Sequence, residues 1–393
     1  MIVTSRSAVA TYQSCPRKRY WQYEAENSTP TRGWERRKLN IPYSTGIYVH
    51  QGLEHLLGGN DATTAAAKAR AAYLAEVEAR SLVVEEGSDV TEVVSEQAAH
   101  VEALVLAWAR VRKPKWDEEY ELVEVEIEDR VPLSDDVTLA VRADAIVRRK
   151  YDHRMFVVNF KTVATADERW MRQWETDMQL MTELLAAERR HGHEFGGVII
   201  EGLIKGRRMP EKDNVGTITG YRDSTPLLYG YKLDANPPLN AGEYGWEYTR
   251  RKGWYRFPVW KENFSSGQGL NYWINWLPEE VVEAQFCVVP PIMRDAERIE
   301  SKVRQIVEME RTIHRNLSYL GKERTLRLGD GTNLHNVMTL DECFPQNEQE
   351  CHWPSKCPCY DLCFTANVAQ DPGGSGLYQP RIDHHKEPSD GGA

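Results

Sequence analysis

Residues 137–161 read VTLAVRADAIVRRKYDHRMFVVNFK, and this stretch decides the fold. Two apolar runs, at 137–148 and 155–161, flank a polar turn, which is the pattern of two neighbouring strands. Asp144 interrupts the first run, while Asn159 and Lys161 interrupt the second. Because alternate residues of a strand share a face, Asn159 and Lys161 lie on the same side of the sheet. The stretch therefore predicts an acid on one strand beside a lysine on its hairpin partner.

The sequence on both sides of this hairpin predicts a mixed α/β fold. Residues 119–129 alternate between apolar residues and glutamate, which indicates a half-buried strand. Residues 196–204 predict an apolar strand of the buried type. A mixed sheet flanked by helices accommodates this order of elements. The spacing of apolar residues predicts helices at 5–24, 45–58, 62–84, 94–112, 166–190 and 293–316.

Changes in composition divide the chain into five regions. Residues 206–280 are rich in Gly, Pro, Trp and Tyr without a clear period, so we interpret them as an insertion. The Gly-, Pro- and Ser-rich charged tail is expected to be disordered. The regions are a helical N-terminal region (1–115), an α/β core (116–205), an aromatic-rich insertion (206–290), a C-terminal helix with a cysteine cluster (291–368) and the tail (369–393).

The composition leads us to expect a cytoplasmic globular protein. Of the 393 residues, 41% are hydrophobic, which allows a sizeable core. No apolar run reaches the roughly 18 residues of a membrane span, and the first residues lack the pattern of a secretory signal. The net charge is −10, but net charge does not report local fields. Basic clusters, each either a solvated face or a phosphate contact, occur at 17–19, 36–38, 148–150, 205–208 and 250–252.

Four cysteines stand in two places almost a whole chain apart. Cys15 is alone near the start, while Cys351, Cys357 and Cys363 are clustered near the end. One cysteine plus three predicts a four-thiolate site for an iron–sulfur cluster or zinc, which would tie the chain ends together. The nearby Cys359 is interpreted as a spare thiol, with a ligand role as the alternative. Cys287 and Cys343 are expected to be ordinary thiols.

The polar residues of the central hairpin suit a metal-and-lysine site. The Asp144 carboxylate would bind a hard cation such as Mg²⁺ or Mn²⁺, which lowers the pKa of a bound water and neutralises phosphate charge. Lys161 would hold the nucleophile and stabilise the pentacoordinate state. His50, four residues after Gly46, and Gln179, on the following helix, are further candidates for this site. Each also has a plain structural interpretation, as a cap, a packed histidine or a solvent-facing amide.

Together these residues resemble the PD-(D/E)XK nuclease superfamily, specifically its RecB-like branch with an iron–sulfur cluster. The AddB nuclease domain and CRISPR-associated RecB-like exonucleases are similar in outline. The early segment of that branch, Ser-x4-Tyr-x2-Cys-Pro-x3-(Phe/Tyr), resembles residues 7–20, which contain Cys15. Its Gly-x3-His resembles residues 46–50, and its closing cysteines resemble those at 351–363.

The resemblance implies a role for each candidate residue. Asp144, Asn159, Lys161 and Gln179 would be catalytic; His50, Asp144 and Asn159 would hold Mg²⁺ or Mn²⁺. Cys15, Cys351, Cys357 and Cys363 would bind a [4Fe–4S] cluster, with zinc as the alternative. The implied substrate is DNA with single-stranded ends, cut by exonuclease or flap-type activity. Protein partners in a repair, recombination, CRISPR or phage complex are also implied. No association with a membrane is expected.

Two positions depart from the pattern of the superfamily. Asn159 stands where its motif has an acid, and Glu183 stands where its last motif has tyrosine. An amide oxygen coordinates Mg²⁺ without charge, so metal affinity should fall, although the Phe160 carbonyl is a further available ligand. One interpretation is that Glu183, one helical turn from Gln179, supplies a displaced carboxylate. The alternatives are a weakened or inactive DNA-binding protein of the same fold, an engineered inactivating change at Asn159, and a zinc-binding interaction module unrelated to nucleases.

Overall fold

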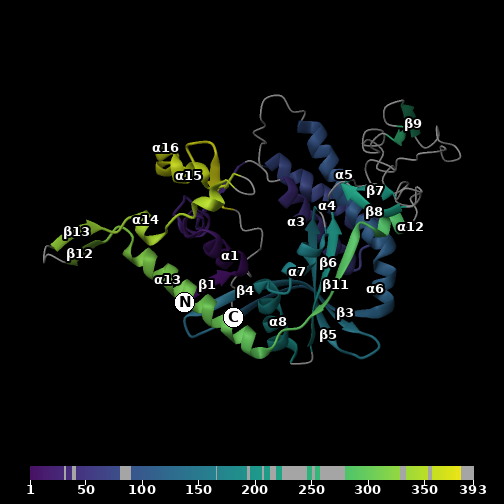
Figure 1. Cartoon of the computed structure of the whole chain (residues 1–393), viewed down its shortest axis with the longest axis horizontal. Coiled ribbons are helices and arrows are strands. Elements are labelled where there is room, and N and C mark those ends of the chain that lie inside the picture. Colours follow the sequence, from purple (N-terminus) through teal and green to yellow (C-terminus); the bar gives the residue numbers. More distant parts are fainter. Residues whose placement is uncertain are drawn as a thin grey trace.

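The computed structural model describes most of the N-terminal region and core, parts of the insertion, and most of the C-terminal region (Figure 1). The described residues are 1–30, 32–37, 41–79, 90–164, 166–192, 195–205, 208–212, 218–223, 246–249, 253–256, 279–327, 333–352 and 356–381.

A mixed sheet forms the centre of the molecule. The residues that the structure describes contribute six strands to it, namely β1 (Ile2–Ser5), β3 (Tyr120–Pro132), β4 (Val137–Arg149), β5 (Met155–Val163), β6 (Phe195–Ile204) and β11 (Phe286–Ile292). β3 is antiparallel to β4 along one edge. On the other edge, β1 runs parallel to β4 up to Ala140, and β5 is antiparallel to it from Ala145 onward. Asp144 therefore lies where the pairings of β1 and β5 diverge.

The sheet confirms the predicted fold class. The four strands predicted at 119–129, 137–148, 155–161 and 196–204 are β3 to β6, with a helix between β5 and β6. β5 and β6 are parallel, as that connection requires. The sequence did not reveal β1 or β11. β1 has only four residues, and β11 contains two prolines, which are tolerated at this position antiparallel to β6.

Helices cover both faces of the sheet (Figure 1). One apolar core joins α3 (Ile41–Leu57), α4 (Ala62–Ala79), α5 (Val90–Val111) and α6 (Lys113–Glu119) to one face. Trp108 is fully buried there, against the rings of Trp116 and Phe160. A second core packs α7 (Glu168–Gln173), α8 (Met178–His191) and α13 (Ala296–Tyr319) on the other face. The strands are held by apolar burial from both sides, so their polar residues stand out as candidates for function.

The helix predicted at 5–24 is broken at Cys15. The structure has α1 (Arg6–Ser14), then α2 (Pro16–Arg19) and a π-helical turn η1 (Tyr20–Glu24). Cys15 is extended, with φ −157° and ψ 113°, because the proline ring of Pro16 disfavours helical backbone in the residue before it. The predicted N-cap is confirmed, since the Ser5 hydroxyl accepts a hydrogen bond from the Ala8 N–H.

The helix predicted at 166–190 is also two helices. α7 ends at Gln173, and α8 begins after Asp177, whose carboxylate accepts a hydrogen bond from the backbone N–H of Gln179. Trp170 lies in α7, and Trp174 is the C-cap residue of this helix. In the structure these two rings pack edge to face, with centroids 5.5 Å apart. One further boundary differs from the prediction, since α3 begins at Ile41 rather than at residue 45. The sequence did not predict the short helix α6.

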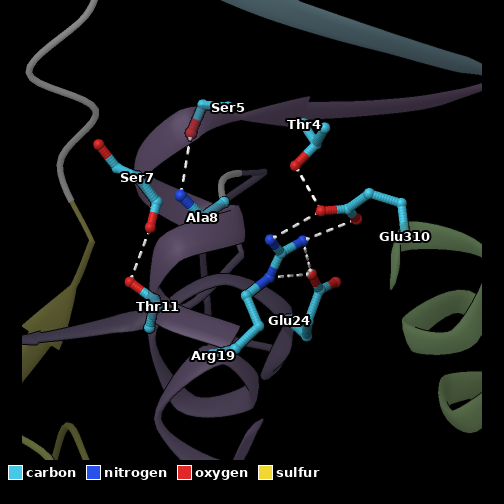
Figure 2. A network of polar contacts seen from close by, with 8 residues as sticks. All are labelled: Thr4, Ser5, Ser7, Ala8, Thr11, Arg19, Glu24 and Glu310. Atoms are coloured by element: carbon cyan, nitrogen blue, oxygen red, sulfur yellow. Dashed lines mark hydrogen bonds and ion pairs between the residues drawn. The ribbon is translucent and has the colours of Figure 1, made fainter. Parts of the chain in front are cut away.

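A buried polar network ties the N-terminal segment to α13 (Figure 2). The Glu310 carboxylate accepts a hydrogen bond from the Thr4 hydroxyl at 2.6 Å and pairs with the Arg19 guanidinium at 3.2 Å. Arg19 also pairs with Glu24 at 2.6 Å. Thr4, Arg19 and Glu310 are all buried. Buried charges persist only when their partners satisfy them, so this network holds α1 and α2 in one place against α13.

The C-terminal segment packs on the same N-terminal helices. It contains α14 (Leu340–Cys343), the short 3₁₀ turn η2 (Glu348–Cys351), α15 (Tyr360–Phe364) and α16 (Ala366–Gln370). Residues from α15 and α16 form a small apolar core with Trp21 and Trp34. Within the predicted tail, β14 (Tyr378–Pro380) pairs with β2 (Trp34–Arg36), while 382–393 lie outside the described residues.

The predicted insertion is described only in part. Its described residues include two hairpins, β7 (Arg208–Lys212) with β8 (Ile218–Asp223), and β9 (Trp246–Thr249) with β10 (Gly253–Arg256). A third hairpin, β12 (Glu323–Arg327) with β13 (Asn333–Val337), follows α13, and α12 (Glu279–Glu283) precedes β11. Among the helices that are described, none combines the length and the apolar character needed to cross a membrane.

Candidate active site

The site begins with the close approach of α3 to β5. A Cβ atom on Gly46 would lie 2.6 Å from the Thr162 hydroxyl oxygen, so only glycine allows this distance. Residues four apart share one face of a helix, so the same approach brings His50 toward the sheet. His50 Nδ1 lies 3.3 Å from an Asp144 carboxylate oxygen. The Gly-x3-His spacing thus has a packing role that delivers the imidazole to the carboxylate.

The Asp144 carboxylate is anchored by groups from two elements. One oxygen faces His50, and the other accepts a hydrogen bond from the Phe160 backbone N–H at 2.7 Å. Burial by itself would raise the pKa of Asp144. The charges of His50 and Lys161, together with these hydrogen bonds, outweigh it and lower the pKa to about 2. Asp144 is therefore ionised at neutral pH, as a ligand for a cation must be.

Asn159 of β5 and Glu183 of α8 are in contact between the sheet and this helix. The Asn159 amide nitrogen donates a hydrogen bond to one Glu183 oxygen, and the Gln179 amide nitrogen donates to the other at 2.5 Å. Asn159 and Glu183 are each 1% exposed. The structure thus brings the β5 residue and the α8 residues together, including the glutamate that stands at the unusual tyrosine position.

The environment of Glu183 favours its protonated form in the absence of a cation. Burial raises its pKa to about 7, and Asp144 adds to the effect, while Lys161 and the amides of Gln179 and Asn159 oppose it. The Asn159 carbonyl oxygen is buried and has no hydrogen-bond partner. A buried acceptor without a donor is costly unless a cation or water satisfies it. Asp144, Glu183 and this amide oxygen are thus oxygen donors of the kind that Mg²⁺ and Mn²⁺ take.

Lys161 lies on the same side of the site as these oxygens. Its charge lowers the pKa of both Asp144 and Glu183, which places it near both carboxylates. Its ammonium is 5.8 Å from the centroid of the Trp174 ring, which covers one side of the lysine. Sequence reasoning missed Trp174, because its contact depends on the break between α7 and α8.

No carboxylate, imidazole or thiolate cluster in the described part of the chain forms a metal site by itself. Three or more His, Cys, Asp or Glu side chains do not gather closely enough among these residues to hold an ion. At the site on β4, β5 and α8, an ion would require the Asn159 amide oxygen as well as the two carboxylates.

The structure brings the cysteines of the two chain ends into one region. Asn347 joins them, because its backbone N–H donates to the Cys15 sulfur at 3.4 Å and its carbonyl accepts from the Cys351 thiol at 3.7 Å. The Cys357 N–H donates to the Cys351 carbonyl at 2.9 Å. Burial raises the pKa of Cys363 to about 12, with added repulsion from Cys357, Cys15 and Cys351. Among the described residues, no three of these sulfurs gather closely enough to form a metal site.

Cys359 differs from these four thiols. It is 1% exposed, and its hydrogen bond to Cys357 is the main cause that lowers the pKa of Cys357 to about 6. The pKa of Cys359 itself is raised by the same bond and by burial. Cys343 packs in a separate apolar cluster with Ile313 and Phe344.

Comparison with protein-family models places most of the chain in a known superfamily. The sequence profile described as the PD-(D/E)XK nuclease superfamily matches residues 3–220, which is more than half of the 393 residues. The matched segment contains most of β1, the helical region and the strands that carry the site. No curated protein matches the chain.

Proposed function

The chain belongs to the PD-(D/E)XK nuclease superfamily, and we propose that it is a Mg²⁺- or Mn²⁺-dependent deoxyribonuclease in which Glu183 replaces the missing motif acid. The observation that carries this proposal is the contact between Asn159 and Glu183. In this proposal Glu183 of α8, which contacts Asn159 directly, supplies the carboxylate that β5 lacks. The unpartnered Asn159 oxygen, Asp144 and Glu183 then form the ligand set, with His50 beside Asp144.

The chemistry divides between the ion and the protein. When bound, the divalent ion lowers the pKa of a water and neutralises charge on the scissile phosphate. His50 and the Phe160 N–H hold the Asp144 carboxylate in one orientation. Gln179 does the same for Glu183. Lys161 lies beside both carboxylates, where its ammonium holds the attacking water and stabilises the negative charge that develops on the phosphate.

We propose DNA with single-stranded ends as the substrate and exonuclease or flap-type cleavage as the reaction. This part of the proposal rests on the resemblance to the RecB-like branch and on its early cysteine segment, which the structure places against the C-terminal cysteines. In the basic cluster of α2, Arg17 and Arg19 are buried in ion pairs, which leaves Lys18 for contact with phosphate groups.

The decisive test compares two site variants with a matched control on labelled single- and double-stranded DNA with Mn²⁺. Lys161→Ala and Glu183→Gln should each lower cleavage by at least about 100-fold, the scale of losing one electrostatic group of an active site. Lys113→Ala serves as the control, because Lys113 is a partly exposed lysine on α6 that pairs with Asp117 on the same helix. Cleavage that survives Lys161→Ala contradicts the nuclease assignment, and cleavage that survives Glu183→Gln contradicts the role of Glu183.

We also propose that Cys15, Cys351, Cys357 and Cys363 bind a [4Fe–4S] cluster with a structural role. The contacts of Cys15 and Cys351 with the same residue, Asn347, support this assignment, because they bring the two ends of the chain together. Zinc is the alternative ion for four thiolates. Metal analysis of anaerobically purified protein distinguishes the two, because a cluster gives iron and sulfide in a brown protein, whereas zinc gives a colourless one.

A second candidate function is a non-catalytic DNA-binding or complex-forming protein on the same fold. Asn159 favours it, because an uncharged ligand weakens the hold on a divalent ion.

A further inference from the structure

A continuous series of polar contacts runs from the start of α1 into the active site. The Arg6 guanidinium pairs with one oxygen of Asp177 at 3.0 Å. The other Asp177 oxygen accepts the Gln179 N–H at 2.6 Å and so caps α8. Gln179 then holds Glu183, and Glu183 accepts from Asn159. Arg6 is 171 residues from Asp177 in sequence, so only the fold makes this connection.

The segment that carries Arg6 is itself held rigidly. Thr4, two residues earlier, donates to Glu310, and Glu310 pairs with Arg19 in the buried network of Figure 2. β1 also runs parallel to β4, with Ser5 opposite Ala140. The Arg6 side chain therefore leaves from a fixed point, which limits the entropy lost in its ion pair with Asp177.

Asp177 has a second cation near it. The charge of Asp177 acts on Arg294, whose guanidinium donates to the Trp174 carbonyl at 2.9 Å. Arg294 contacts the C-cap residue of α7, whereas Arg6, the first residue of α1, pairs directly with Asp177. The ion pair with Arg6 holds one oxygen of Asp177, and the other oxygen caps α8.

We propose that Arg6 is a positioning residue that sets the Gln179–Glu183 side of the active site through the cap of α8. The inference rests on the proposed function for its catalytic consequence, but the orientation of α8 is a property of the metal-free protein. Without Arg6, the Asp177 carboxylate is free to turn toward Arg294, and the first turn of α8 loses its cap. Glu183, two turns into the helix, would then shift relative to Asn159 and Asp144.

The experiment compares Arg6→Gln, Arg6→Lys and the matched control Arg311→Gln. Arg311 pairs with Asp136 at 2.8 Å and is exposed to a similar degree, but its contacts do not lead to α8. Mn²⁺ binding, measured by calorimetry, should weaken about tenfold in Arg6→Gln, the low end of the range for groups behind metal ligands. Arg6→Lys should recover most of the affinity, and Arg311→Gln should bind as the wild type does.

Two further readouts separate positioning from general damage. Hydrogen exchange of the amides at 178–182 in metal-free Arg6→Gln should be faster than in the wild type, while exchange in β5 stays the same. In Arg6→Gln, kcat for cleavage should fall while KM for DNA stays unchanged. In the Asp177→Ser background, which retains a cap without charge, Arg6→Gln should have no further effect.

The outcomes keep the two proposals apart. Unchanged exchange and Mn²⁺ affinity in folded Arg6→Gln overturn the role of Arg6, whatever the activity of the wild type. Equal losses in Arg6→Gln and Arg311→Gln overturn it as well, because they indicate general destabilisation. Absence of Mn²⁺ binding and cleavage in the wild type overturns the proposed nuclease function, and the exchange measurement still tests Arg6.

Discussion

The Asn159 amide donates a hydrogen bond to the Glu183 carboxylate, and each of these side chains is 1% exposed. The contact joins β5 to α8 at the two positions where the chain departs from the pattern of its superfamily. The two departures are therefore in one place, and the acid that one position lacks is present at the other.

This contact predicts the effect of restoring the motif acid. Asn159→Asp would place two buried carboxylates in contact, and like charges at this distance repel. We expect the metal-free variant to lose about 1–3 kcal/mol of stability, with a larger gain in Tm on adding Mn²⁺ than the wild type shows. Thermal unfolding with and without Mn²⁺ measures both. Cleavage should change little, so a large gain in rate would show instead that the natural site is inactive.

The approach of α3 to β5 makes a second prediction. In Gly46→Ala the new methyl group would lie 2.6 Å from the Thr162 hydroxyl oxygen, so α3 must move outward. We expect a loss of about 1–3 kcal/mol in stability from overpacking. Displacement of His50 from Asp144 should also lower cleavage by up to about 100-fold.

The same contact supplies its own control. Thr162→Ala removes the hydroxyl that Gly46→Ala would meet, so the double variant should regain much of the stability and activity. Urea unfolding and cleavage rates complete the cycle. Strictly additive losses would mean that the hydroxyl is not what limits the approach of α3.

The cysteine region gives a prediction about metal removal. Under the proposed four-cysteine assignment, Cys15→Ser should abolish iron binding and the brown colour, because it removes the one ligand from the N-terminal end. Cys343→Ser is a suitable control, since Cys343 is also buried but lies in a separate apolar cluster. Iron and sulfide analysis compares the two variants, and equal metal content in both would contradict the four-cysteine assignment.

Lys205 predicts a dependence of stability on pH. Burial lowers its pKa to about 8, and its ammonium lies 3.5 Å from the Thr162 hydroxyl. Between this value and the higher pKa of the unfolded chain, the unfolded state binds more protons, so stability rises as the pH increases. Relative to Lys205→Met, the wild type should gain on the order of 2 kcal/mol from pH 8 to pH 10.5.

Urea unfolding of both proteins across this range tests the prediction. The comparison with Lys205→Met removes the contribution of the other groups that titrate there. A constant difference in unfolding free energy between the two proteins would show that Lys205 keeps an ordinary pKa.

Local patterns predicted the strands well and the helix boundaries less well. The alternation of residues identified β3 because a half-buried strand shows its two faces in the sequence, and apolar runs identified β4, β5 and β6. The same method extended one helix across Cys15, although Pro16 carried the signal for the break. It also extended a helix across 174–177, where α7 ends and Asp177 caps a new helix.

The sequence by itself determined which residue types were available and which faces they occupied. Asn159 and Lys161 share a side of β5, and Gly46 and His50 share a side of α3, because strand and helix periods are local properties. The tertiary structure alone decided which faces meet. His50 reaches Asp144 across 94 residues, and Arg6 reaches Asp177 across 171, because two apolar cores press helices onto both sides of one sheet. Contacts at such separations depend on the packing of the whole chain and leave no period in the sequence.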